Sequence, residues 1–562
     1  MPSSVCAYLV QKLFYRAQRF LRIAICICAI ALSCKGGIFA TANSAESSSV
    51  DSYSPCAPPS ASDKVNSTDI DNEETIVVSK VTFTCNTSIG SDELHKHIAP
   101  FLGIPLRPLQ LEQLRQSVTQ LYVDRGFATS GAIIPPEAFK DGVLQIRIVE
   151  GKVVETRVQG NERLREAYVT SRLIRQNEPL QMSVLEERMR LLLTDPLFEQ
   201  INARLLPGPT LGTAILDVTV KRQNPYGLSL SASNYQAPAV GSSFAEIDGW
   251  VRNLTTWGDT LSLSVRGNES SNGYDLGWAI PVLGRSTMIN LRYSKGASSV
   301  TEEPLDALDI DSRVTTKEIG ISYPFIDTAR RRLATGLTFG ERENRTTLLG
   351  EPFSFVAGEQ TGRTVVRDWR WHQEFLQRFD KHAISLRSTF TWGKNNVNGE
   401  PPVDGQPSSN FSLWLGQVQT VSSVFSGTAQ VVTRATYQHS ANVLVPLERL
   451  SLGGRYSVRG YRENQLVRDN GYNLSAELHY PLVGDDQSKR RVTLIPFVDL
   501  GGGKNRDAES EQLASAGLGL NWRFARFEGE LFYGKRLKTP KVNAQGDLQD
   551  HGIHIQLRFN VF

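Results

Sequence analysis

From about residue 223 onward the sequence consists of short segments in which apolar and polar side chains alternate, separated by turn-forming Gly, Asn, Asp and Pro. Residues 471–480 are the clearest example, and residues 553–561 at the C-terminus repeat the pattern. Alternation with a period of two is typical of β-strands that have one apolar face. Because helical periodicity is missing from residue 223 to residue 562, the pattern predicts an all-β fold for this part of the chain.

The apolar strand faces have two candidate environments. In a soluble sandwich they would form the core, whereas in an exported chain they could face lipid while the polar faces line a lumen. Aromatic residues at both ends of an apolar face, such as Tyr472 and Tyr480, are typical of interfacial girdles. Only a closed barrel leaves no unpaired strand edge in lipid. We therefore predict a transmembrane barrel of about 16 antiparallel strands, which start near residues 227, 243, 258, 272, 286, 313, 332, 363, 381, 411, 426, 470, 490, 512, 526 and 551.

The first 42 residues have the features of a signal peptide. They contain five basic side chains and no acidic one, an apolar run at residues 23–32 that is too short to span a bilayer, and an Ala-Thr-Ala sequence at residues 40–42. Export would place the remaining Cys56 and Cys85 in an oxidising compartment, which permits a disulfide between them. The sequence leaves this pairing open.

Helical periodicity is confined to residues 76–222, after a Ser-, Asp-, Asn- and Pro-rich stretch at residues 43–75 that we interpret as a linker. Residues 76–150 predict the order strand, helix, helix, strand, strand, and residues 151–222 repeat it. This order lacks the strand–helix alternation of a parallel sheet. We therefore predict two small α+β domains rather than a single α/β domain.

The sequence offers no catalytic, metal or cofactor site. The mature chain contains no G-x-S-x-G, H-E-x-x-H or C-x-x-C motif, and residues 501–504, Gly-Gly-Gly-Lys, lack the spacing of a phosphate loop and are better explained as a turn after a strand. The net charge of +3 gives no indication of a nucleic-acid partner. We expect no enzyme activity, no bound metal, no cofactor and no nucleic acid; a protease or lipase with residues from distant strands has no motif in its favour.

One constellation points to function, and it joins a long connection to a strand. Residues 440–469 are long for a hairpin connection and contain Arg459. Farther on, Asp499 is an acid inside an apolar strand, on the same face as Phe497 and opposite to Val498. If the face of Val498 meets lipid, Asp499 points into the lumen, where a loop folded inward could bring Arg459 to it as a bidentate pair. The alternative is a solvated Asp at a strand end.

At these positions the sequence resembles the two-partner secretion transporters, the TpsB branch of the superfamily that includes the barrel-assembly machinery. Residues 126–151 are similar to the first POTRA domain of that family, and the resemblance extends over residues 76–562. The family also has an N-terminal plug helix, for which residues 43–75 offer no clear amphipathic pattern. The two signature motifs correspond to Val458, Arg459, Gly460 and Tyr461 in the long loop and to Phe497, Asp499 and Gly501 in the barrel wall.

Besides the signal peptide at 1–42, the resemblance implies periplasmic POTRA domains at 76–150 and 151–222 and an outer-membrane barrel at 223–562 in a Gram-negative bacterium. It implies that the loop motif and the wall motif act together in gating. The substrate would be a secreted partner of the adhesin or haemolysin type with its own N-terminal secretion domain, recognised by the POTRA domains. Further partners would be outer-membrane lipid and the barrel-assembly machinery that inserts the protein.

Two other functions fit parts of this pattern. An outer-membrane insertion or assembly factor of the same superfamily would as a rule carry three or more POTRA domains, and the sequence has room for two. A passive porin would not need about 150 residues of folded domain ahead of its barrel. We therefore expect a protein exporter.

Overall fold

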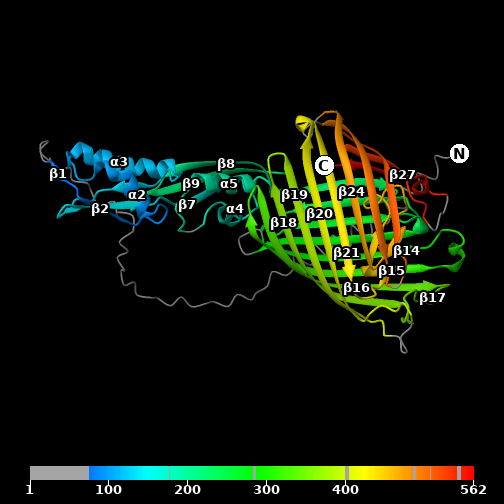
Figure 1. Ribbon diagram of the computed structural model, residues 1–562. Helices are drawn as coiled ribbons and strands as arrows, with labels where there is room; N and C mark the ends of the chain where they lie inside the picture. The colour runs from blue at the N-terminus through cyan, green and yellow to red at the C-terminus, as the bar shows by residue number, and fades with distance from the viewer. Residues whose placement is uncertain are drawn as a thin grey trace. The chain divides into compact units, whose positions relative to one another are not determined.

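The computed structural model describes residues 75–562, apart from 176, 283–286, 399–403, 485–488, 507 and 541–545. The predicted leader, the linker up to residue 74 and Cys56 therefore lie outside the described residues, whereas Cys85 is described and is disulfide-bonded. None of the described helices is long and apolar enough to cross a membrane. The described α-helices, α2 to α5, belong to the two N-terminal modules, coloured blue to teal, and the rest of the described chain is dominated by strands (Figure 1).

The first module packs two helices on a small mixed sheet. The sheet order is β2-β6-β4, with β2 parallel and β4 antiparallel to β6. Alternate residues of β6, Leu144 and Ile146, are buried and pack with Leu94 of α2 and Leu114 of α3. The elements are β1 (Ile76–Val77), β2 (Lys80–Thr84), α2 (Ser91–Ile98), β3 (Pro105–Leu106), α3 (Pro108–Asp124), β4 (Gly131–Ile133), β5 (Phe139–Lys140) and β6 (Val143–Val149).

The second module repeats this plan, as the sequence pattern predicts. Its sheet order is β7-β9-β8, again with a parallel and an antiparallel neighbour on the central strand. Leu173 of α4 and Leu185 of α5 are buried against Leu216 and Val218 of β9. Its elements are β7 (Lys152–Gln159), α4 (Glu166–Leu173), α5 (Met182–Leu192), β8 (Phe198–Pro207) and β9 (Thr213–Arg222).

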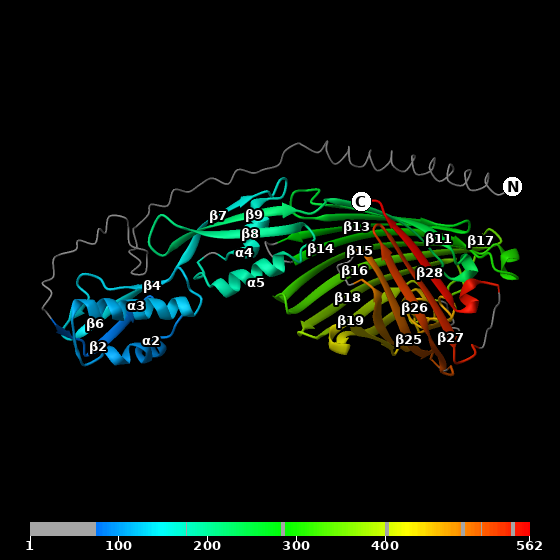
Figure 2. The same ribbon diagram turned by 90° about the horizontal axis from the view of Figure 1, so that it is seen from above.

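The remainder of the described chain forms a closed antiparallel barrel of 16 strands, which confirms the predicted fold class. The last strand, β28, pairs with the first, β10, and so leaves no open edge; Figure 2 shows β28 in red close to the green early strands. A two-residue strand, β17 (Glu351–Pro352), extends the end of β16. The long strands are β10 (Tyr226–Ser233), β11 (Phe244–Arg252), β12 (Thr260–Gly267), β13 (Ser271–Val282), β14 (Thr287–Ser299), β15 (Asp311–Asp327), β16 (Arg331–Leu348), β18 (Arg363–Arg378), β19 (His382–Asn395), β20 (Asn410–Val424), β21 (Ala429–Ser440), β24 (Asn470–Val483), β25 (Arg490–Lys504), β26 (Glu511–Phe524), β27 (Phe527–Arg536) and β28 (Ile553–Asn560).

The strand alternation separates an apolar outer face from a polar inner face. On β25, Val498 is exposed on the outside, while its neighbours Phe497 and Asp499 are buried on the inside. On β28, Leu557 is outside and His554 is inside and buried. The glycine-rich residues 501–504 correct one expectation, because they continue β25 to Lys504 instead of forming a turn.

Between β21 and β24 the chain folds against the inner face of the barrel. We call residues 441–469 the inward loop; it contains a short hairpin of β22 (Leu450–Leu452) and β23 (Leu466–Arg468). Val458 and Tyr461 of the loop are fully buried in an apolar cluster with Leu513 of β26. The loop is thereby fixed to the wall by packing as well as by polar contacts.

Candidate functional site

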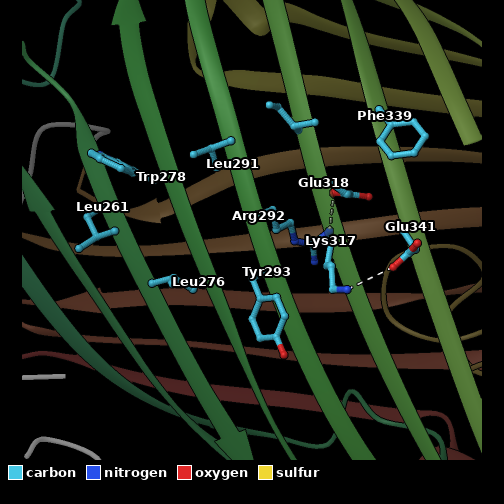
Figure 3. A pocket seen from close by; sticks show the side chains of 11 residues that line it. Leu261, Leu276, Trp278, Leu291, Arg292, Tyr293, Lys317, Glu318, Phe339 and Glu341 are labelled. Carbon is cyan, nitrogen blue, oxygen red and sulfur yellow. Dashed lines mark hydrogen bonds and ion pairs between the residues drawn. The ribbon is translucent and has the colours of Figure 1, made fainter. Parts of the chain in front are cut away.

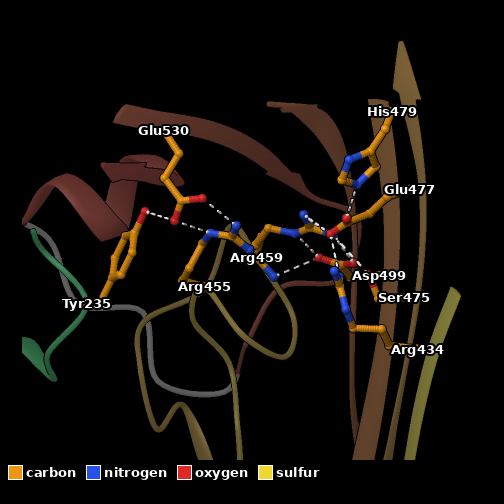
Figure 4. A network of polar contacts seen from close by, with 9 residues as sticks. All are labelled: Tyr235, Arg434, Arg455, Arg459, Ser475, Glu477, His479, Asp499 and Glu530. Carbon is orange, nitrogen blue, oxygen red and sulfur yellow. Dashed lines mark hydrogen bonds and ion pairs between the residues drawn. The ribbon is translucent and has the colours of Figure 1, made fainter. Parts of the chain in front are cut away.

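The site is built around Arg459, which lies in the inward loop and is almost completely buried (Figure 4). Its Nε and Nη2 donate to the two carboxylate oxygens of Asp499, each at 2.7 Å, in a bidentate pair. Its backbone N–H donates to the same carboxylate at 3.0 Å. The structure thus brings together the two charged residues of the loop and wall motifs, and both side chains are at least 98% shielded, with exposed fractions of 2% and 0%.

Two further wall residues also accept hydrogen bonds from the guanidinium group. Nη1 of Arg459 donates to Glu477 of β24 at 2.7 Å, and Nη2 donates to Ser475 of the same strand at 3.0 Å. Glu477 also accepts from Arg434 of β21 at 2.9 Å. The sequence pattern placed Ser475 and Glu477 on the polar face of their strand, but that face offers four polar residues and nothing in the spacing singles out these two.

The guanidinium group is also stacked on aromatic rings. Its central carbon lies 3.6 Å from the ring centroid of Phe497 and 5.1 Å from that of Phe532. The two rings lie edge to face at 5.9 Å. An arginine that is stacked and bonded to three wall side chains in a low-dielectric setting is held far more firmly than one in a surface ion pair.

Gly460 permits the close approach of the loop to the wall. Its φ angle is +89°, and an added Cβ would lie 2.6 Å from the carbonyl oxygen of Gly534 on β27. A side chain at this position would meet both a strained backbone and a backbone clash. The Gly460 carbonyl accepts from Arg536 Nε at 2.6 Å, so that the loop is bonded to β27 on this side.

The remaining motif residues fill the space around the ion pair. The hydroxyl of Tyr461 lies 2.8 Å from the carbonyl oxygen of Ala514 and 2.6 Å from that of Lys538. Gly501 of the wall motif faces Val458, whose Cγ2 would lie only 2.6 Å from a Cβ at residue 501. Val458 and Arg459 of the loop motif therefore contact the wall motif directly, while Gly460 and Tyr461 attach the loop to β26, β27 and Lys538 beside it.

A second group of ion pairs joins the loop to other parts of the barrel. Arg455 bonds to Glu530 of β27 at 2.9 Å, and Glu530 accepts from Tyr235, which follows β10, at 2.8 Å (Figure 4). Arg462 pairs with Asp550 and with Glu302, each at 2.5 Å. These partners could not be predicted from the spacing of residues, because they lie between 75 and 160 residues away from the loop arginines.

The chemistry of this site is electrostatic and steric. Among the described residues no group of three His, Cys, Asp or Glu side chains could hold a metal ion. Burial raises the pKa of the loop carboxylate Glu463 to about 7, although the backbone N–H of Arg455 donates to it at 2.6 Å. The ion pairs and the packing described above hold the loop against the wall.

Comparison with known proteins places this geometry in context. Residues 212–522 match the family model described as haemolysin secretion/activation protein ShlB/FhaC/HecB, and residues 76–151 match the model described as POTRA domain, ShlB-type. The chain is 23% identical to the heme/hemopexin transporter protein HuxB of Haemophilus influenzae (strain 86-028NP), over 78% of this chain and 79% of that protein. It is 24% identical to the outer membrane transporter CdiB of Escherichia coli O6:K15:H31, over 82% of this chain and 79% of CdiB. A solved structure of CdiB from Escherichia coli superposes with a TM-score of 0.68 and 19% identity, covering 90% of this chain and 94% of that chain.

Proposed function

The chain belongs to the haemolysin secretion/activation family of two-partner secretion transporters, and from this premise we propose how it selects and releases its cargo. Members of this family are outer-membrane translocators of a partner exoprotein, a class of transporters and not of enzymes. The barrel accordingly lies in the outer membrane and the POTRA modules lie in the periplasm. The proposal concerns the two steps that belong to this chain, recognition in the periplasm and passage through the barrel.

The gate of this transporter is the inward loop. The observation that carries this proposal is that Arg459 of the loop is buried between Asp499 and Glu477 of the barrel wall. The loop occupies space that a translocating chain needs, so it has to shift during export. Val458, Arg459, Gly460 and Tyr461 form the latch, and the wall motif of Phe497, Asp499 and Gly501 receives it. Removing one partner of a buried pair costs about 3–5 kcal/mol, which is large enough to decide whether the latch stays closed.

Recognition is assigned to the POTRA modules. The sheet of the first module has β2 and β4 at its edges, and the sheet of the second has β7 and β8, so the described residues leave backbone groups of these strands unpaired within their sheets. An extended segment of the cargo can add to such an edge through main-chain hydrogen bonds, with specificity from its alternate side chains. The first module, residues 76–150, carries the selection in this proposal.

The recognition step is tested by export of a candidate partner, a large secreted protein with an N-terminal secretion domain, co-expressed with the transporter. Deletion of residues 76–150 should abolish export while leaving a folded, heat-modifiable barrel in the outer membrane. Retained export by this deletion variant would assign recognition to the barrel or to the second module.

The gate is tested separately by the conductance of the purified full chain in planar bilayers. Arg459→Ala should increase the fraction of time in an open, conducting state. Arg434→Ala is the matched control, because Arg434 also bonds to Glu477 but lies on a wall strand and not in the loop. An unchanged conductance for Arg459→Ala would refute the latch.

A further inference from the structure

The outer face of the barrel carries a band of charge on strands β15, β16, β18 and β19. Arg313, Arg345 and Arg363 occupy directly opposite positions on three neighbouring strands. All three are exposed, and they share the strand phase of outward-facing residues such as Ile319 on β15 and Leu337 on β16. Like charges directly opposite each other destabilise a sheet, so this row of arginines needs a counter-charge.

The carboxylates within the band do not balance its cations. Glu343 pairs with both Arg345 and Arg363, and Arg313 has no ion pair among the described residues. The next outward-facing position on β16 after Glu343, in the direction of the periplasm, is Glu341. Its carboxylate pairs with Lys317 at 3.2 Å and with Arg367 at 2.8 Å. Over these positions the outer basic band has six basic side chains and two acidic ones, Arg313, Lys317, Arg345, Arg363, Arg367 and Lys394 against Glu341 and Glu343, and a third acid, Asp311, precedes Arg313 on the same face of β15.

The band begins where the apolar outer face ends. The next register positions toward the periplasm hold Ile319, Phe339, Trp369 and Trp392, with the Phe339 and Trp369 rings 5.1 Å apart. Aromatic residues on an outer-membrane barrel mark the boundary between acyl chains and headgroups. Because β10 starts directly after the periplasmic second module, the antiparallel order puts the first residues of β15 and β18 at the outer surface. The band is therefore at the level of the outer-leaflet headgroups.

An apolar hollow lies beside the band on the same outer face (Figure 3). It is lined by Leu261, Leu276, Leu291 and Phe339, while Lys317 and Glu341 stand at its polar side. An apolar hollow next to a set of cations fits a ligand that combines hydrocarbon chains with anionic groups. A free inorganic anion would use the cations alone.

We propose that the outer basic band and this hollow form a binding site for a phosphorylated, multiply acylated glycolipid of the outer leaflet. The guanidinium groups of Arg313, Arg345 and Arg363 bind its phosphate oxygens, a geometry for which the planar arginine side chain is suited. The acyl chains lie along the hollow. The bound phosphates neutralise the arginine row, and the ligand fixes the depth of these strands in the membrane.

The experiment titrates the full-length protein, purified in a non-ionic detergent, and counts bound lipid by native mass spectrometry. The probes are lipid A with both phosphates, the same lipid A after removal of its phosphates, and inorganic phosphate. The test variant is Arg313→Gln with Arg345→Gln and Arg363→Gln. The control is Lys504→Gln with Lys535→Gln, two exposed lysines at the outer ends of β25 and β27.

Phosphorylated lipid A should bind the test variant on the order of 100-fold more weakly than the wild type, since each basic side chain near an anionic membrane surface contributes about 1 kcal/mol. The control should bind like the wild type, and lipid A without phosphates should bind the wild type as weakly as the test variant binds the phosphorylated form. Equal affinity of the test variant and the wild type would overturn the site, as would equal affinity for the two lipids. Displacement of lipid A by inorganic phosphate at comparable concentration would overturn the assignment to a lipid. The comparison of the two lipids on the wild type requires no variant to fold.

Discussion

The inner wall near β24 and β25 and the outer wall near β15 to β18 both carry clusters of arginine. The two clusters differ in how deeply the arginines are buried and in how many carboxylates neutralise them. Inside, Arg459 is 2% exposed and meets two carboxylates and an aromatic ring. Outside, Arg345 is 64% exposed and lies directly between two other arginines. The inner cluster is complete within the protein, whereas the outer cluster is short of counter-charge.

This difference shows what each cluster is suited for. A buried pair that is broken leaves an uncompensated charge, so the inner cluster has a high cost of opening and can act as a latch. Exposed pairs are worth about 0–1 kcal/mol, so the outer cluster contributes little to the fold and is free to take a partner from the membrane.

The largest effect is expected when the inner pair loses one partner. Asp499→Ala should lower the free energy needed to detach the loop from the wall by about 3–5 kcal/mol. The reason is that Arg459 stays buried with Glu477 as its one remaining carboxylate partner. The open fraction in planar bilayers should rise, as for Arg459→Ala, without a loss of barrel from the outer membrane, and the temperature at which the heat-modifiable form unfolds should drop. Reversal of the pair, Arg459→Asp with Asp499→Arg, should not restore the closed state, since residue 459 would then be an acid next to Glu477. Wild-type conductance of Asp499→Ala would return Asp499 to the role of an ordinary wall carboxylate.

An intermediate effect is expected from steric exclusion at the same latch. Gly501→Val places side-chain atoms where Val458 packs and should destabilise the closed loop by about 1–3 kcal/mol. Val458→Ala in the same chain should recover part of this loss, because it removes the methyl groups in conflict. The measurement is bilayer conductance of the single and double variants; additive effects of the two substitutions would contradict direct packing.

A smaller effect is expected from the loop carboxylate Glu463, whose pKa of about 7 lies above its ordinary value of 4.5. A carboxyl with a raised pKa in the folded state gives its full stabilisation below pH 4.5 and loses it as the pH rises through 7. The loop should thus become easier to release between pH 5 and 8, by about 1–2 kcal/mol after allowance for solvent screening. Glu463→Gln, which keeps an oxygen to accept from Arg455, should flatten this pH profile in thermal unfolding. Identical profiles for both proteins would show that Glu463 does not control the loop.

The fold could be predicted from sequence because its signals are local. A strand such as residues 471–480 alternates over its own length, since one face meets lipid and the other meets the lumen. The prediction of a turn at residues 501–504 was wrong for a long-range reason. Gly501 and Gly503 are small where the loop residues Val458 and Arg468 pack against them, and β25 continues through them.

The site could be predicted only in part from such local signals. Strand phase and the resemblance of the two motifs led to Arg459 and Asp499, but the third partner, Glu477, depends on the register of β24 with β25, which sequence spacing does not give. The outer arginine row is hidden for the same reason, because Arg313, Arg345 and Arg363 become neighbours only through pairing of three strands. The net charge of +3 gave no sign of a polyanionic ligand, because it averages this local cluster over the whole chain.

The smallest effect on the protein itself is expected at the outer arginine row, and the size of this effect distinguishes the two walls. In detergent without added lipid, Arg345→Gln should change the free energy of unfolding by less than about 1 kcal/mol, because it loses an exposed contact with Glu343 and also removes repulsion between opposite arginines. With phosphorylated lipid A present, the wild type should gain thermal stability and the variant should gain less, because only the wild type has the full row to bind phosphate. A decrease of several kcal/mol in the free energy of unfolding of Arg345→Gln in plain detergent would mean that the outer row stabilises the fold as the inner latch does. The proposed difference between the two walls would then be wrong.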